Sequence, residues 1–203
     1  MTDPEPAATR RSLHGVAELL LAGPQYRATR RIDLRVTTGG FATVTGPELR
    51  VEGGQLVAGA TRAPLAGRTY DEVAATAGIE AGEPAGVYDG GPGVSPGETI
   101  TLAAGPLETL LAAFTEGDRA LREFAPEATP VLWPEHFDVA ITLDEVNYGV
   151  SPGDGHIAEP YAYVGPHHPR QGGFWNAPFG AARPLRELGG AVAAYFRTGR
   201  GLL

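Results

Sequence analysis

Alternating hydrophobic and polar residues mark the clearest element of this chain, over residues 31–36. Ile32, Leu34 and Val36 are separated there by charged side chains, and a period of two is typical of a strand with one buried face. Gly–Gly and Gly–Pro pairs then divide residues 37–56 into short apolar runs. Tight turns between short runs predict a four-stranded antiparallel meander.

A helical period of apolar residues occurs in four other stretches, residues 12–22, 69–77, 106–125 and 184–200. A further strand is predicted over residues 137–143, with its odd-numbered residues on the buried face, and residues 144–183 are expected to form a long irregular loop region. This order indicates an α+β fold in which helices cover a mainly antiparallel sheet. We expect a disordered tail over residues 1–9 and a single domain over residues 10–203.

Several helix boundaries carry specific signals. Ser12 is a favourable N-cap for the first helix, and Gly23–Pro24 is expected to end it. Thr69 and Glu72 have the spacing of a capping box at the start of the second helix. Gly117 interrupts the third helix, which predicts either a kink or a close packing partner at that position.

The chain contains no cysteine, and all sixteen basic residues are arginine. Disulfides, thiolate metal sites, iron–sulfur clusters and cysteine nucleophiles are therefore excluded. A Schiff-base lysine and the lysine of a phosphate-binding loop are excluded for the same reason. The composition thus leaves no cofactor that depends on cysteine or lysine.

Charge is unevenly distributed along the chain. Residues 69–160 carry two arginines and seventeen acidic residues, whereas both flanking segments are net basic. This acidic middle either attracts a cation or an amine, or forms ordinary solvated surfaces. The formal net charge of -8 argues against nucleic acid as a partner, because such binding depends on cations that neutralise phosphates.

The N-terminal residues do not have the pattern of a signal peptide. Arg10 and Arg11 precede an apolar run, but His14 and Glu18 interrupt it. No apolar run approaches the ~18 residues needed to span a bilayer. We therefore expect a cytoplasmic protein without a membrane partner, and the sequence holds no signal for its oligomeric state.

Residues 131–183 contain four of the five histidines, both tryptophans and three of the seven tyrosines, among many turn-forming residues. Aromatic walls with a few polar groups are typical of small-molecule sites, although the same residues could form a minor core. Tyr161 and Tyr163 are two residues apart and are predicted to share one face of a short strand. The candidate ligand-binding residues are Trp133, Asn147, Tyr161, Tyr163, Trp175 and Asn176.

The same stretch also offers ligands for a divalent transition metal. The candidates are His136, Asp138, His156 and His167, and zinc, iron and manganese accept imidazole and carboxylate groups. In a strand that extends back to residue 136, His136 and Asp138 would face the same side. None of the spacings is diagnostic of a metal site, so hydrogen-bonded structural roles remain the alternative.

Two copies of the pattern Gly-x-Ser-x-Gly occur, at residues 93–97 and 149–153. In a hydrolase nucleophile elbow, the backbone N–H of the residue after the serine helps to form the oxyanion hole. Proline follows both Ser95 and Ser151 and has no N–H. We interpret both motifs as rigid turns and exclude serine nucleophile chemistry.

Three strings, LWPEHFDVAITLDEVNYGVSPGD at 132–154, EPYAYVGP at 159–166 and FWNAPFGAARP at 174–184, resemble a family of conserved actinobacterial proteins. That resemblance covers most of the chain and implies no catalytic residues. The leading hypothesis is therefore a small-molecule-binding domain whose site lies within residues 131–183. The alternatives are a metal-assisted hydrolase or isomerase that uses the same stretch, and a protein-interaction module.

Overall fold

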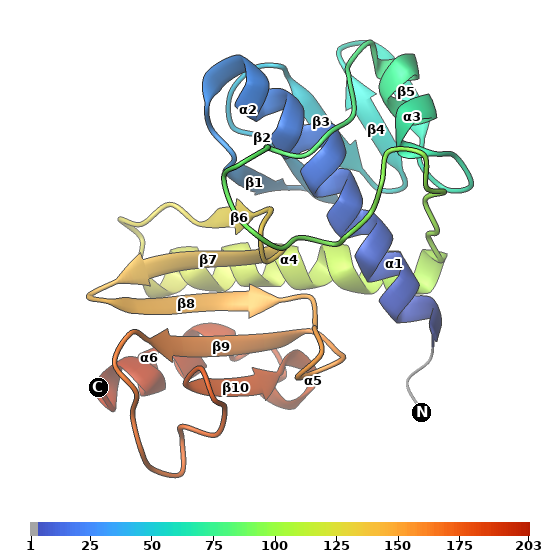
Figure 1. The fold of residues 1–203 in the computed structure, drawn as a ribbon. Helices are drawn as coiled ribbons and strands as arrows, with labels where there is room; N and C mark the ends of the chain where they lie inside the picture. Colours follow the sequence, from blue (N-terminus) through green and yellow to red (C-terminus); the bar gives the residue numbers. More distant parts are fainter. Residues whose placement is uncertain (1–3) are drawn as a thin grey trace. The chain divides into compact units, whose positions relative to one another are not determined.

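The computed structural model describes residues 4–203 and has an α+β fold, as predicted (Figure 1). The chain divides into two compact units. The first unit comprises the chain up to Ala112 together with Leu132–Phe137, and the second comprises Ala113–Val131 and Asp138–Leu203. The single domain expected over residues 10–203 stays a prediction, and each unit is described by itself below.

One long helical segment opens the first unit. It consists of α1 (Pro4–Gly15), the π-helix η1 (Val16–Ala22) and α2 (Gly23–Thr29). The predicted end at Gly23–Pro24 is wrong, because the π-helical segment changes the hydrogen-bond register: the Gly23 N–H donates to the Glu18 carbonyl, five residues back. Pro24 then lies in the first turn of α2, where a missing N–H costs little.

The start of this segment corrects two further expectations. Residues 4–9 of the predicted disordered tail form the first turns of α1, while residues 1–3 lie outside the described residues. Ser12 lies inside the helix, and its hydroxyl accepts a hydrogen bond from the Thr101 N–H instead of capping. The Thr9 hydroxyl likewise accepts from the Ala103 N–H. Partners about ninety residues away therefore hold these turns, and local sequence carries no sign of them.

A six-stranded antiparallel array completes the sheet of the first unit. Its strands are β1 (Leu34–Thr37), β2 (Gly40–Thr43), β3 (Leu49–Glu52), β4 (Gln55–Ala58), β5 (Thr61–Pro64) and β6 (Val131–Trp133), in the order β6-β1-β2-β3-β4-β5. The predicted four-stranded meander is confirmed as β1–β4. The fifth strand carries Arg62 and ends in Pro64, features that suit an edge strand and hide its periodicity.

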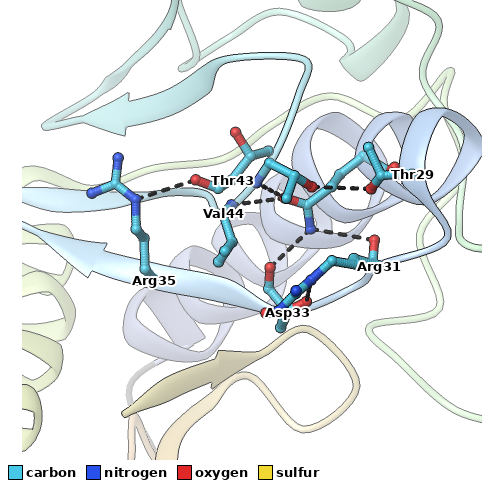
Figure 2. Close-up of polar contacts among 8 residues, drawn as sticks. Thr29, Arg31, Asp33, Arg35, Thr43 and Val44 are labelled. Carbon is cyan, nitrogen blue, oxygen red and sulfur yellow. Dashed lines mark hydrogen bonds and ion pairs between the residues drawn. The ribbon is translucent and has the colours of Figure 1, made fainter. Parts of the chain in front are cut away.

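Gln25 joins α2 to this sheet. Its side chain is completely buried, and its amide nitrogen donates to the carbonyl oxygens of Arg31 and Asp33 at 3.3 and 2.8 Å. Its amide oxygen accepts from the N–H groups of Val44 and Thr45 at 2.7 and 2.9 Å. Figure 2 shows these contacts gathered between the end of the helix and two strands. One side chain thus satisfies four backbone groups.

Residues 80–99 cross the N-terminal helical segment as an extended loop (Figure 1). The Gly82 N–H donates to the Leu19 carbonyl, and the Tyr88 hydroxyl donates to Glu18 Oε1 at 3.1 Å. Arg11 donates to the carbonyl oxygens of Pro92 and Gly93. Glu18 is buried by this loop, and burial raises the pKa of its carboxyl.

Two more helices follow in the chain. The helix α3 (Tyr70–Ala77) begins with the predicted capping box, in which Thr69 and Glu72 exchange side-chain to backbone hydrogen bonds. The helix α4 (Ala104–Phe124) runs without interruption through Gly117, and its residues from Ala113 onward belong to the second unit. A β-carbon at Gly117 would lie 2.6 Å from Val139 Cγ1 and 2.8 Å from Val150 Cβ. The close packing partner predicted at this glycine is therefore the sheet.

The second unit has a four-stranded antiparallel sheet in the order β10-β9-β8-β7. Its strands are β7 (Asp138–Leu143), β8 (Val146–Ser151), β9 (Tyr161–Pro166) and β10 (Ala181–Pro184). The region 144–183 that was predicted to be a long irregular loop thus contains three strands. Glycine, proline and small residues occupy one face of these strands, so the alternation that marks a strand is weak.

Two helices end the chain, where a single one was predicted. They are α5 (Leu185–Leu188) and α6 (Val192–Gly201), separated by Gly189 and Gly190 in left-handed conformations at φ 55° and 86°. One face of the second sheet packs on α6 and the second half of α4, through Val139, Val150, Tyr148 and Val164. Tyr148 contacts Phe124 and Phe196 at the centre of this layer.

Candidate functional site

The candidate site lies on the sheet face of the second unit that points away from α4 and α6. The strand register pairs Ala140 with Gly149, Gly149 with Tyr163, and Ser151 with Tyr161. Because side chains alternate along a strand, these residues share the face opposite Val139, Val150 and Val164. We call the side chains of Asp138, Asp154, His156, Tyr161, Tyr163 and Phe179 the tyrosine–aspartate face.

Tyr163 is fixed from two directions. Its hydroxyl donates a short hydrogen bond to Asp138 Oδ2, and its ring lies over the backbone of Gly149. Asp138 is only 7% exposed. Burial, the negative charge of Asp138 and the hydrogen bond to it hold the pKa of Tyr163 well above its ordinary value. This tyrosine is therefore a neutral hydrogen-bond donor at physiological pH.

Tyr161 forms a second tyrosine–carboxylate pair. Its hydroxyl donates to Asp154 Oδ2 at 2.6 Å, while Asp154 Oδ1 accepts from the N–H groups of His156 and Ile157 at 2.7 and 2.8 Å. Burial opposes ionisation of Asp154, but these three hydrogen bonds outweigh it and lower the pKa of Asp154. Burial, together with the bond to Asp154, raises the pKa of Tyr161. Asp154 is thus an ionised anchor for the Tyr161 ring.

Phe179 and His156 add rings above the two tyrosines. The Phe179 ring stacks on Tyr161 with centroids 6.3 Å apart and meets Tyr163 edge-on at 6.4 Å. His156 contacts Phe179 edge-on at 5.5 Å. Phe179 remains 37% exposed. The face therefore presents several rings beside two carboxylates, with one ring reaching solvent.

The structure divides the predicted binding residues into separate groups. Tyr161 and Tyr163 share a face as predicted, and Asn147 lies on the same face, where its amide oxygen accepts from Thr142 Oγ1 at 2.8 Å. Asn176 exchanges two hydrogen bonds with the backbone of Ala182 and fixes the loop before β10. The amide of Asn176 is thereby occupied by the loop itself.

Trp175 belongs to a different aromatic cluster. It packs edge-on against Phe174, which contacts Tyr195 of α6 and lies close to Gly199. Gly199 also lies against Val164, so this cluster is on the helix side of β9. Trp133 belongs to the first unit and is 39% exposed. Neither tryptophan contributes to the tyrosine–aspartate face described here.

The predicted metal ligands do not form a cluster. Within residues 4–203, no group of three histidine, cysteine, aspartate or glutamate side chains is arranged to hold a metal ion. His136 and Asp138 do not share a strand face, because Phe137 adopts a left-handed conformation at φ 55° and β7 begins only at Asp138. His156 packs on Phe179, and exposed His167 donates its backbone N–H to the Glu145 carbonyl.

The serine motifs form turns, as interpreted from the prolines. Ser151 ends β8, and its hydroxyl accepts from the Gly153 N–H at 3.2 Å. Ser95 lies in the loop over the N-terminal helix, where its N–H donates to Glu98 Oε1 at 2.6 Å. The acidic anchor of the site, Asp154, follows directly after the second motif. An aspartate that precedes a glycine turn is the sequence signal that could have identified it.

His14 occupies a buried position in the first unit, as expected for a structural histidine. Its Nε2 lies 2.6 Å from the Pro134 carbonyl oxygen, and its ring stacks on Phe137 with centroids 5.0 Å apart. Burial is the main cause that lowers the pKa of His14 to about 4. The imidazole is therefore neutral at physiological pH and donates to the carbonyl.

Comparison of the chain with protein-family models, curated proteins and solved structures finds no significant match. Membership of the actinobacterial family therefore stays a prediction. Among residues 4–203, no helix has the length and apolar character required to cross a membrane.

Proposed function

We propose that this protein binds a small organic molecule at the tyrosine–aspartate face. The observation that carries the proposal is the pairing of buried Asp138 with Tyr163 on the sheet face away from the helices. Burying a carboxylate opposes folding unless hydrogen bonds compensate for the lost water. Perturbed titratable groups beside aromatic rings are concentrated at functional sites, which favours ligand recognition here.

The chemistry of the face supports binding more than turnover. Each tyrosine hydroxyl is committed to a carboxylate, so neither is positioned as a nucleophile with its own base. Ser151 accepts a hydrogen bond from its own turn. What the face offers a ligand is a set of ring surfaces and negative charge, which are recognition groups.

The experiment that tests the proposal is a fragment screen by ligand-observed NMR, with cationic, anionic and neutral fragments in equal numbers. Hits are repeated on Tyr163→Phe, which removes only the hydroxyl bonded to Asp138. Tyr148→Phe is the matched control, since it makes the same change on the opposite face of the same sheet. We expect hits that weaken in Tyr163→Phe and persist in Tyr148→Phe. A screen without such hits would contradict the proposal.

A further inference from the structure

We infer that the ligand of the tyrosine–aspartate face is an organic cation, such as a quaternary or primary ammonium group. This inference rests on the proposed function, because it names the ligand class for the same face. It is carried by the combination of two carboxylates with electron-rich rings in a part of the chain that contains no compensating arginine.

The charge around the face is negative. The sequence has eight acidic residues and no arginine between Arg122 and Arg170. Two of these acids near the sheet are paired with arginines from the C-terminal helices, Asp144 with Arg200 at 3.2 Å and Glu159 with Arg186 at 2.7 Å. Asp138 and Asp154 instead accept hydrogen bonds from the neutral hydroxyls of Tyr163 and Tyr161. Their negative charge is shared with the rings but is not cancelled by them.

The arginine nearest in the strand register is directed to the other side. Arg183 of β10 is paired with Ala162, which lies on the helix side of β9 between Tyr161 and Tyr163. Its positive charge acts on Tyr195 of α6, in agreement with that placement. The tyrosine–aspartate face therefore keeps its negative potential, which an anionic ligand would oppose.

The rings supply the second half of the recognition. The centroids of Tyr161, Tyr163 and Phe179 are 6.3 to 6.4 Å apart from one another. A cation within about 6 Å of a ring centroid is attracted by the π-electrons of that ring. A hydroxyl that donates to a carboxylate increases the electron density of its ring, so both Asp–Tyr pairs strengthen this attraction. Polarisable organic cations use ring faces and carboxylates together.

The test compares pairs of probes that have the same shape and differ in charge. Choline with 3,3-dimethylbutan-1-ol and benzyltrimethylammonium with neopentylbenzene derivatives form such pairs, and pivalate is the anionic member. Binding is measured from chemical-shift changes of backbone amides in β7–β9. We expect each cation to bind at least about tenfold more tightly than its neutral isostere, and the difference to shrink as salt is added.

Two variants separate charge from ring chemistry. Asp138→Asn is expected to remove most of the preference for the cation, and Asp144→Asn is the control because Asp144 pairs with Arg200. Since Asp138 is buried and its replacement could prevent folding, Phe179→Leu provides an independent test at an exposed ring. It should lower cation affinity by about threefold to tenfold while leaving the neutral isostere unchanged.

The outcomes distinguish the two proposals. Fragments that bind this face without preference for cations, or that prefer pivalate, would overturn the inference while leaving the proposed function intact. Cations that bind tightly but respond to neither Asp138→Asn nor Phe179→Leu would also overturn it. If no fragment of any charge perturbs the face, the proposed function itself fails.

Discussion

Gly149 lies beneath the ring of Tyr163, so closely that a β-carbon at position 149 would come within 2.6 Å of Tyr163 Cζ and its hydroxyl oxygen. The absence of a side chain on β8 is thus what allows Tyr163 of β9 to reach Asp138 of β7 across the middle strand. The hydrogen bond that defines the candidate site depends on a glycine that carries no chemistry of its own.

Gly149→Ala should therefore displace the Tyr163 ring and weaken its bond to Asp138. We expect a loss of about 1–3 kcal/mol in the free energy of unfolding, because an added methyl group overpacks a filled space. Urea unfolding measures the loss, and a change in near-UV circular dichroism reports the displaced tyrosine. Gly155→Ala is the control, since no described atom lies within 4 Å of its β-carbon position. Equal stability of the two variants would show that Tyr163 has room to move.

Gly117 and Gly105 of α4 should respond to alanine in opposite directions. Alanine at Gly117 would meet Val139 and Val150, so we expect a net loss of about 1–3 kcal/mol despite the better helix propensity. Gly105 has no described atom within 4 Å of its β-carbon position, and alanine there should raise stability by up to about 1 kcal/mol. Chemical denaturation of both variants measures the contrast. Stabilisation by Gly117→Ala would mean that the helix and the sheet can separate without cost.

Gln25→Leu should be among the most damaging single changes in the first unit. It would leave two buried carbonyl groups and two N–H groups without the partner that satisfies all four. We expect a loss of about 3 kcal/mol or more in the free energy of unfolding. Gln55→Leu, in β4, makes the same change at a half-buried residue whose amide oxygen accepts only a 3.4 Å bond from Arg62. Similar losses in both variants would rule out a special role for Gln25.

His14 should make stability depend on pH between its two pKa values. Its pKa is about 4 in the folded protein and 6.5 ordinarily, so the unfolded chain binds more protons in that window. Stability should accordingly fall as the pH drops from 6.5 to 4, by roughly 3 kcal/mol over the window. His14→Gln should flatten this part of the curve, whereas the same substitution at exposed His167 should leave it unchanged. Unfolding measured at several pH values would contradict the assignment if the slope persisted in His14→Gln.

Tyr195→Phe should be neutral or stabilising, by up to about 1 kcal/mol. The Tyr195 hydroxyl is buried without a hydrogen-bond partner among the described residues, and the whole residue is 8% exposed. Removing it spares the cost of taking a hydroxyl out of water. Thermal unfolding of the variant gives the answer directly, and a clear loss of stability would indicate that a bound water or ligand satisfies this hydroxyl in solution.

Local patterns predicted the elements whose determinants are close in sequence. The meander over residues 34–58 and the capping box at Thr69 and Glu72 follow from adjacent turns and from a three-residue spacing. Gly23–Pro24 was misread because the π-helical register that accommodates the proline is set by hydrogen bonds to Gly82 and by tight packing there. A breaker in the sequence is only a prior, and distant partners can override it.

The candidate site was predictable to the same extent. The two-residue spacing of Tyr161 and Tyr163 placed both on one face correctly. Pairing across strands brings Asp138 and Asp154 to them, and this register is not visible in a single sequence. Trp175 was grouped with the tyrosines by composition, but its contact with Phe174 and the packing of Phe174 on α6 place it elsewhere.

The π-helical segment Val16–Ala22 also sets the angular phase between the two helices that it joins. Each residue of an α-helix advances the chain by about 100° around the axis. Deleting one residue from this segment and restoring ordinary α-helical bonding would turn everything before it by that angle. Arg11 would then face away from Pro92 and Gly93, and His14 would leave Pro134. Homologous chains that lack the wide turn should therefore show a one-residue gap within η1, together with a different set of partners for α1.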